Sequence, residues 1–375
     1  MRLASVILAA ASLASAAVPR ILPKAPILPQ APNLPTSAFP KFHTLPLEDA
    51  RAFKDLEGLG LDLTKILEEP APKPEDGLAR ISTFSASTCQ ANPNMRIEWK
   101  RYPAADRRAF IAAIKCLMGK PTSGRFSPST NRYEDLVRLH QMYMPNIHGN
   151  PKFMLWHRYY TWTFEQELRD ECGFTRPMPW WDETLDAGKF AQSDMFTNTD
   201  YFGRLPAASN GRPVCIVSGA FAGMTCNIGP GTSNTPHCLS RAVDESATSQ
   251  CNSAYVQTCN SRTTFSTMAS CAETGPHAFC HNGIGGAMAD VSASPSDPIF
   301  WMHHTFIDRN FRVWQNVAVS RRTSIDGVDG AGQPLTLDTT IYMGGIRPDV
   351  KVRDILNTLS GAMIGGKEFC YRYDY

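Results

Sequence analysis

Histidines at helical spacing are the residues of this sequence that could carry chemistry. The chain has nine histidines. Most of them fall into two groups that can each supply three imidazoles: His140, His148 and His157, then His277, His281 and one of His303 and His304. His277 and His281 are four residues apart, which places both imidazoles on one face of a helix. Each group can therefore chelate one metal ion.

The donor type narrows the choice of metal. Neutral imidazole suits copper, zinc, iron or nickel, and three histidines can also build a catalytic zinc site. A di-iron bundle would need paired glutamates and Glu-x-x-His motifs, which the predicted helices lack. Two all-histidine sites that face each other therefore favour copper. Because adjacent helical residues point about 100° apart, only one of His303 and His304 can face the same metal.

Apolar residues at helical spacing predict the elements that position these histidines. They mark the ranges 106–118, 133–143, 153–168, 277–283 and 298–317. Residues 185–275 show no sustained period and are rich in Gly, Ser, Thr, Asn and Cys, which predicts long loops. The cysteines there are too loosely spaced for a zinc site and predict disulfides. The expected fold is mainly α, with a central four-helix bundle that holds a dinuclear copper site and with long disulfide-stapled loops.

Length and composition exclude several classes of protein. The chain has 375 residues, 43% of them hydrophobic, which rules out global disorder. Its 37 Lys and Arg residues balance 35 Asp and Glu without a basic block, so nucleic acid is not an expected partner. No apolar run reaches the roughly 18 to 20 residues that span a bilayer, so no membrane insertion is expected. Eleven cysteines are an odd number, so at least one thiol stays free or pairs between chains.

The start of the chain predicts export. Residues 1–16 begin with the charged Arg2, continue through a short apolar centre and end at the small residues Ala14, Ser15 and Ala16. This order is typical of a secretory signal peptide. The cysteine count agrees with an oxidising destination. We therefore expect the protein to be secreted.

A proline-rich stretch follows the predicted signal peptide. Between residues 19 and 46 prolines recur nearly every third position, which favours an extended chain that builds no core. We interpret 17–84 as a proline-rich segment or propeptide with one short helix within 47–68. The catalytic domain is expected to span 85–375. The mature protein is expected to start within 47–85 and to be active without cleavage at its C-terminus.

Longer residue strings surround the histidines. They are His148-x4-Phe153-Met-Leu-Trp156-His157-Arg158-x2-Thr161-x3-Glu165 and Asp297-Pro298-Ile-Phe300-Trp-Met-His303-His304-x3-Asp308. These strings resemble the two copper signatures of the tyrosinase, catechol oxidase and haemocyanin family of dicopper proteins. Two shorter strings, Arg96-x-Glu98-Trp99 and Tyr371-Arg-Tyr373, are similar to the start and the close of fungal tyrosinase-like domains. The resemblance covers most of the chain from Cys89.

Carried over to this sequence, the resemblance implies two copper ions per chain. It makes His140, His148 and His157 the ligands of the first copper, and His277, His281 and His304 the ligands of the second. His303 is then a neighbour of the second site that packs or forms a hydrogen bond behind it.

The resemblance also assigns roles around the metals. Phe300, one helical turn before the third ligand of the second copper, is expected to pack under the site. Asp308 is expected either to orient an imidazole N–H or to form an ion pair. Glu273 resembles the acid that holds a water near the second copper. Val291 resembles the position that controls access of substrate over the second copper.

Three positions depart from the family pattern. Residue 146 is Asn, and no cysteine lies between Cys116 and Cys172, so no thioether to the second ligand of the first copper is expected. Residue 278 is Ala where relatives that hydroxylate monophenols often carry Asn. Asn282 is our candidate to replace that amide and to help Glu273 hold a water. Hydroxylation is therefore expected to be slow.

The resemblance implies an enzyme whose partners are a phenolic small molecule and O2. The favoured function is a catechol oxidase, which converts o-diphenols to o-quinones. The alternative is a tyrosinase that also hydroxylates monophenols, including one that tailors a tyrosine-containing peptide or secondary metabolite. An oxygen-binding protein of haemocyanin type is a third possibility. The oligomeric state stays open.

Overall fold

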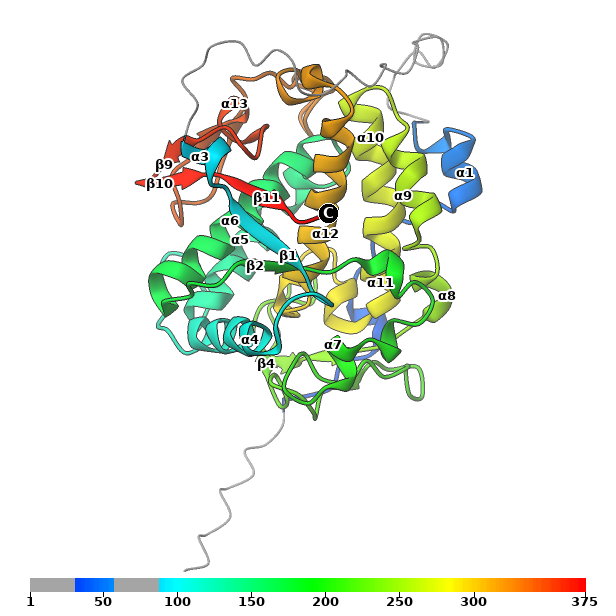
Figure 1. The fold of residues 1–375 in the computed structure, drawn as a ribbon. Coiled ribbons are helices and arrows are strands. Elements are labelled where there is room, and N and C mark those ends of the chain that lie inside the picture. The colour runs from blue at the N-terminus through cyan, green and yellow to red at the C-terminus, as the bar shows by residue number, and fades with distance from the viewer. Residues whose placement is uncertain (1–30, 57–87) are drawn as a thin grey trace, which may run out of the picture. The chain divides into compact units, whose positions relative to one another are not determined.

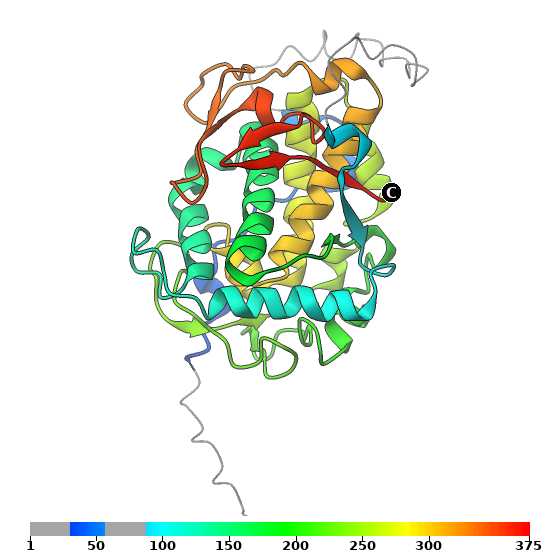
Figure 2. The ribbon, with the colours of Figure 1, turned by 60° about the vertical axis from the view of Figure 1, so that its left-hand side comes forward.

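Four helical stretches form the bundle that carries the histidines. They are α5 (Arg132–Ile147), α6 (Lys152–Cys172), α11 (Ala278–Ile284) and α12 (Phe300–Asn316). Helix α6 packs against both α5 and α12, and α4 (Ala104–Met118) crosses the ends of α5 and α6 (Figure 2). The predicted mainly α fold with a central bundle is confirmed.

The computed structural model describes residues 31–56 and 88–375. The predicted signal peptide, 1–16, lies outside the described residues, as does the stretch 57–87. Shorter helices and strands complete the described chain (Figure 1): α1 (Leu47–Arg51), α3 (Thr88–Ala91), β1 (Asn94–Glu98), β2 (Met178–Trp180), α7 (Asp194–Thr197), β3 (Val214–Cys215), β4 (Thr225–Cys226), β5 (His237–Cys238), β6 (Ser240–Arg241), α8 (Glu245–Thr248), α9 (Ser253–Asn260), α10 (Phe265–Ala272), β7 (Thr340–Ile341), β8 (Val350–Lys351), α13 (Val352–Ile355), β9 (Ala362–Ile364), β10 (Lys367–Phe369) and β11 (Tyr371–Tyr373).

Local sequence explains where the ligand-bearing helices begin and end. The side chain of Asn131 caps α5 by accepting a hydrogen bond from the main-chain N–H of Glu134. Pro145 lies in the last turn of α5, and the chain leaves the helix at His148 in an extended conformation. Helix α6 ends at Gly173, whose φ of 64° is the left-handed conformation that closes a helix. His148 therefore lies at a helix end.

A π-helical turn, η5 (Glu273–His277), joins α10 to α11. Gly275 departs from helical geometry within it and packs against the ring of Tyr255. A Cβ at position 275 would lie 2.4 Å from the Tyr255 Cε2 atom, so only glycine fits there. This turn sets the positions of Glu273 and His277 relative to α12.

The largest sheet brings residues near the two ends of the stretch 88–375 together. Strand β1 lies between β11 and β2 and runs parallel to both, with Arg96 opposite Tyr373. The disulfide Cys89–Cys370 closes the same end. The two short motifs that resemble the start and the close of tyrosinase-like domains are therefore neighbours in space.

Disulfides hold the loop-rich part of the chain, as predicted. The five bridges are Cys89–Cys370, Cys116–Cys172, Cys215–Cys238, Cys251–Cys280 and Cys259–Cys271, and Cys226 is the buried free cysteine. Within this predicted loop-rich stretch, 185–275, the chain also forms α9 and α10, two helices of eight residues each that the sequence did not predict. Their apolar runs are too short to show a sustained period, and packing against neighbouring elements stabilises them.

The N-terminal segment, which we define as residues 31–56, packs on the catalytic part of the chain. Helix α1 contacts α9, and the 3-10 turn Lys54–Leu56 contacts α10 (Figure 1). Phe39 and Phe42 are buried. The expectation that the proline-rich stretch builds no core is therefore wrong, because its two phenylalanines supply the apolar surface that the prolines lack.

Candidate metal centre

The first three predicted ligands converge on one point. The Nε2 atom of His140 lies 3.3 Å from that of His148 and 3.3 Å from that of His157. The Nδ1 atoms of His140 and His157 donate to the main-chain carbonyls of Ser292 and Phe153, each at 2.9 Å. Because a carbonyl oxygen only accepts, these Nδ1 atoms carry the protons and the Nε2 atoms keep their lone pairs. The lone pairs face one another across the position of an ion.

The second three converge in the same way. His277 and His281 donate from Nδ1 to the carbonyls of Glu273, at 3.1 Å, and Met288, at 2.7 Å. The Nε2 atom of His281 lies 3.1 Å from that of His304. The Nε2 atom of His277 is buried without a hydrogen-bond partner. An unpartnered buried ring nitrogen is costly unless a metal ion binds it.

The charge state of the six imidazoles fits a metal site. Burial lowers the pKa of every one of them, and that of His140 and His148 falls to about 3. Neighbouring imidazoles lower the pKa of His157 and His304 further. Neutral imidazoles with free lone pairs are donors that suit copper, as they also suit zinc, iron and nickel. The residues present therefore fit copper.

The two clusters adjoin each other. The rings of His157 and His304 stack with their centroids 4.5 Å apart. Phe300 stacks on His304 at 3.9 Å and meets the edge of His140 at 5.6 Å. The structure thus places Phe300 under both clusters, where it excludes water from the metal-binding side chains.

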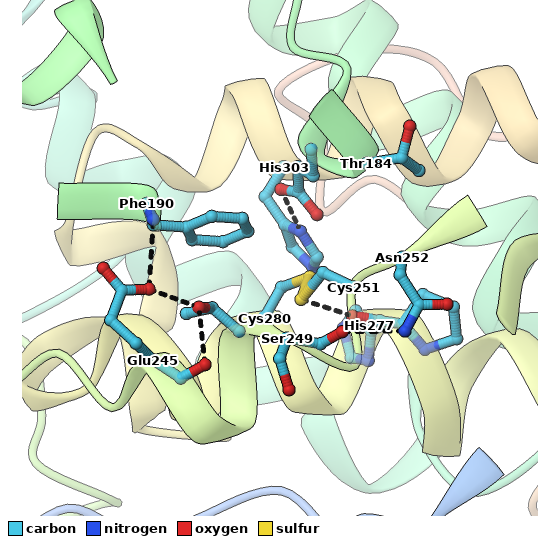
Figure 3. Close-up of a disulfide and its surroundings, with 12 residues drawn as sticks. Thr184, Phe190, Glu245, Ser249, Cys251, Asn252, His277, Cys280 and His303 are labelled. Carbon is cyan, nitrogen blue, oxygen red and sulfur yellow. Dashed lines mark hydrogen bonds and ion pairs between the residues drawn. A yellow bond between two sulfur atoms is a disulfide. The ribbon is translucent and has the colours of Figure 1, made fainter. Parts of the chain in front are cut away.

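His303 lies behind the second cluster. Its Nδ1 atom is 2.8 Å from a carboxylate oxygen of Glu183. The ligand atoms of His303, Glu183 and Cys280 lie within 4.8 Å of one another, and Figure 3 shows His303 and His277 beside the disulfide Cys251–Cys280. Burial lowers the pKa of His303 to about 3 and raises that of Glu183. The ligand atoms of His303, His277, His281 and His304 also lie within 4.8 Å of one another, so the neighbour role of His303 stays a prediction.

Glu273 connects the two clusters. Its carboxylate accepts a hydrogen bond from the main-chain N–H of Gly149 at 2.8 Å and contacts Nδ1 of His148 at 3.0 Å. Burial raises the pKa of this carboxyl to about 8. Glu273 therefore orients a ligand of the first cluster, and its role in holding a water stays a prediction. Ala278 is buried and adds only a methyl group.

Asp308 forms ion pairs and does not touch an imidazole. It lies 2.6 Å from Arg158 and 3.3 Å from Arg96, and it accepts hydrogen bonds from the hydroxyls of Tyr371 and Tyr373, each at 2.6 Å. Burial raises the pKa of Asp308, but the two guanidinium groups outweigh burial and hold that pKa below its usual value. Of the two predicted roles, the ion pair is the one that the structure shows.

Phe42 of the N-terminal segment covers the second cluster, which the sequence did not predict. Its ring stacks on His281 at 4.2 Å and meets the edges of His277 at 4.9 Å and His148 at 5.5 Å. The side chain is 7% exposed. The sequence shows only that Phe42 is an aromatic residue within a proline-rich stretch, which does not predict where its ring packs.

Asn282 holds this cover in place. Its Oδ1 atom accepts from the N–H of Phe42 at 3.2 Å, and its Nδ2 atom donates to the carbonyl of Phe42 at 2.8 Å. The N–H of Val291 donates to the carbonyl of Pro40 at 2.8 Å. Both polar atoms of Asn282 are thus used by the segment, so its role beside Glu273 stays a prediction for the state in which the segment has left.

Comparisons with known proteins agree with this geometry. Residues 130–317 match the family model described as the common central domain of tyrosinase. Tyrosinase P of Aspergillus terreus is 28% identical over 361 residues, which cover 79% of this chain and 97% of that protein. Tyrosinase ustQ of Aspergillus flavus is 28% identical over 295 residues, which cover 75% of this chain and 80% of that protein.

The fold is also similar to that of a solved structure. A polyphenol oxidase of Thermothelomyces thermophila, solved as a mutant, superposes with a TM-score of 0.66 at 24% identity, covering 88% of this chain and 97% of the other. The chain belongs to the tyrosinase family of oxidoreductases. Among the described residues, no helix has both the length and the apolar character that a membrane span requires.

Proposed function

We propose that the protein is a secreted dicopper polyphenol oxidase that converts o-diphenols to o-quinones. The observation that carries the proposal is the pair of buried imidazole clusters, one of three histidines and one of four, that adjoin at His157 and His304 with ring centroids 4.5 Å apart. Copper held there supplies electron transfer between the phenol and dioxygen. Two diphenols give up four electrons and four protons, and one O2 leaves as two waters.

The protein's own residues orient the ligands and exclude water. Main-chain carbonyls fix the ring orientation of four ligands, and Glu273 contacts the ring of His148. Phe300 closes the site from below. Ala278 offers no polar atom to a water that would take a proton from a monophenol. These features favour diphenol oxidation over monophenol hydroxylation.

Copper analysis and oxygen uptake test the proposal. We expect two coppers per chain, and uptake of O2 with 4-methylcatechol that exceeds uptake with 4-methylphenol. Because Phe42 covers the second cluster, both substrates should be compared on the intact chain and on the Phe42→Ala variant. One copper per chain, or no oxidation of either phenol by the variant, would contradict the proposal.

A tyrosinase is the second candidate, because the relatives in the two Aspergillus species carry that name. The ratio of initial rates on 4-methylphenol and 4-methylcatechol separates the two activities. Comparable rates would make hydroxylation part of the function. A much lower rate on the monophenol would favour the catechol oxidase.

We also propose that the protein is exported. The five disulfides are typical of oxidising compartments.

Proteolytic processing of the N-terminal part is a further element of the proposal. Cleavage between residues 57 and 85 would separate the covering segment from the catalytic domain, which agrees with a mature protein that starts within 47–85. N-terminal sequencing and intact mass of secreted material test the start. Activation that requires trimming near Tyr375 would contradict it.

A further inference from the structure

We infer that the groove occupied by Phe42 is a binding site for a peptide-bound phenol, so that substrates include extended peptides carrying an o-diphenol side chain. Asn282 is the positioning residue of this site. The inference rests on the proposed oxidase function and adds the class of substrate.

The ring of Phe42 occupies the position that a substrate ring needs. It lies flat on His281, with an interplanar angle of 27°, and edge-on to His277, with an angle of 88°. Both are predicted ligands of the second copper. A benzene ring is thus already held against the metal-binding side chains by contacts that a catechol ring can also make.

The main chain around this ring is held as well. Asn282 makes two hydrogen bonds to Phe42, one to the N–H at 3.2 Å and one to the carbonyl at 2.8 Å. Two residues earlier, the carbonyl of Pro40 accepts from the N–H of Val291 at 2.8 Å. A free catechol has no main chain to make these three bonds, whereas any extended peptide has one.

The groove does not bind the side chains on either side of Phe42. Lys41 and His43 are exposed, whereas Phe42 between them is buried. Further along, the N–H of Leu45 donates to the carbonyl of Thr274 at 3.0 Å, which is again a main-chain contact. The site therefore recognises one aromatic ring and an extended backbone, and it accepts different flanking residues.

An open cleft adjoins the groove. It has a volume of about 510 Å³, and the N-terminal segment lines it with Lys41, Phe42, Thr44 and Pro46. The rest of the chain contributes residues that include Gln250, Phe279 and Asn282. Because the segment forms part of the wall, its departure would widen the cleft and expose the ring position to a peptide.

The reaction of such a substrate balances like that of a free catechol. The o-diphenol side chain loses two electrons and its two hydroxyl protons and becomes an o-quinone. Half an equivalent of O2 takes up these electrons and protons and leaves as water. No bond of the peptide backbone breaks.

The segment itself provides the test. The amino acid 3,4-dihydroxyphenylalanine is incorporated at position 42 of the copper-loaded full chain, and in matched controls at the exposed positions 41 and 43. We expect the residue at 42 to lose two hydrogens in a first-order reaction whose rate does not depend on protein concentration. Intact mass and quinone absorbance follow the reaction. At positions 41 and 43 we expect rates at least about tenfold lower.

The outcomes separate this inference from the proposed function. Equal rates at all three positions, or an unreactive residue at 42 in a protein whose Phe42→Ala variant oxidises 4-methylcatechol, would overturn the inference and leave the oxidase function standing. If the Phe42→Ala variant oxidises no phenol at all, the proposed function fails, and the inference that rests on it fails with it.

Asn282→Leu tests the positioning residue, since leucine has a similar volume but makes neither hydrogen bond. We expect the rate at position 42 to fall at least about tenfold, because two hydrogen bonds are lost, and kcat/KM for 4-methylcatechol in the Phe42→Ala background to fall less. An equal fall in both would indicate a merely structural role and overturn the assignment.

A peptide added in solution tests the substrate class directly. The probe is the acetylated and amidated hexapeptide Pro-Lys-X-His-Thr-Leu, where X is 3,4-dihydroxyphenylalanine. The enzyme is the chain cleaved within residues 57–85 and separated from the N-terminal segment, so that the bonds to Asn282 and Val291 are free for the peptide. We expect a KM at least about tenfold below that of 4-methylcatechol, because the peptide adds the main-chain bonds. Equal KM values would overturn the claim that peptides are preferred.

Discussion

The two ends of the described chain both pack on the histidine-bearing helices, but they are held in different ways. At the C-terminal end, β11 pairs with β1, the disulfide Cys89–Cys370 closes the sheet, and Tyr371 and Tyr373 bind Asp308. At the other end, the N-terminal segment contains no cysteine. It is held by main-chain hydrogen bonds, by Asn282 and by the ion pair Asp55–Arg262 at 2.8 Å.

This difference indicates that the C-terminal end supports the histidine-bearing helices, whereas the N-terminal segment only covers them. A disulfide typically contributes about 2–4 kcal/mol to stability, and one hydrogen bond about 0.5–1.5 kcal/mol. Asp308 lies one helical turn beyond His304 in α12, so the C-terminal end supports the helix that carries a predicted metal ligand. The N-terminal segment lies over the predicted ligands, and we expect it to open locally without unfolding of the bundle.

The largest expected effect is at the supported ligand. His304→Ala should remove the second copper and abolish diphenol oxidation, because two imidazoles cannot complete the site. His303→Ala is the matched control, and it should retain copper with an affinity lower by about 10- to 100-fold, as is usual when a residue behind a ligand is lost. Copper content and oxygen uptake check both. The reverse result would show that His303 is the ligand.

The second-largest effect is expected on the free energy of unfolding when the contacts of the C-terminal end are removed. Asp308→Ala leaves the buried guanidinium of Arg158 without a carboxylate partner and that of Arg96 with Glu165 alone, and it should cost about 3–5 kcal/mol of unfolding free energy. Asp338→Ala removes one partner of the exposed ion pair Arg353–Asp338 and should cost less than about 1 kcal/mol. Denaturant unfolding measures both. Similar losses in the two variants would show that the C-terminal end carries no special support.

A smaller effect, on kcat/KM, is expected when the ring of Phe42 in the N-terminal segment is removed. Phe42→Ala removes a buried ring worth roughly 1.5–3 kcal/mol, which corresponds to a segment that opens about 10- to 100-fold more often. The kcat/KM for 4-methylcatechol should rise by up to that factor, and the midpoint of global unfolding should change little. Lys41→Ala, at an exposed neighbour, is the control and should leave both unchanged. A large fall in the unfolding midpoint would place the segment within the cooperative core.

The smallest effect is expected on the ratio of monophenol to diphenol rates when Ala278 is replaced. Ala278→Asn adds an amide next to His277, and the ratio of monophenol to diphenol rates should rise by roughly three- to tenfold, because a better-held water is a better base. Ala278→Leu adds similar volume without an amide and should not raise the ratio. Initial rates on 4-methylphenol and 4-methylcatechol measure it. A rise in both variants would assign the effect to volume alone.

The helices could be predicted from the sequence, as could the two groups of histidines that the structure brings together, whereas copper binding by them stays a prediction. The apolar period of α5, α6 and α12 extends over many residues, and the spacing of His277 and His281 fixes their common face within one helical turn. Helices α9 and α10 were missed because two turns are too few to show a period. An ion pair was one of two roles predicted for Asp308. Its buried partners could not be predicted, since the sequence does not show which arginines and tyrosines lie beside it in the fold.

The predictions that the sequence supports are local: they concern which side chains are candidates for binding copper and which helical faces present them. Which residues cover those side chains became visible only in the folded chain. Phe42 and Asn282 are 240 positions apart in the chain, and no periodicity or spacing links residues at that separation. Their contact exists because a buried aromatic ring gains free energy from leaving water and an amide satisfies the main chain beside it. Both gains depend on a surface that forms only when the helices have packed.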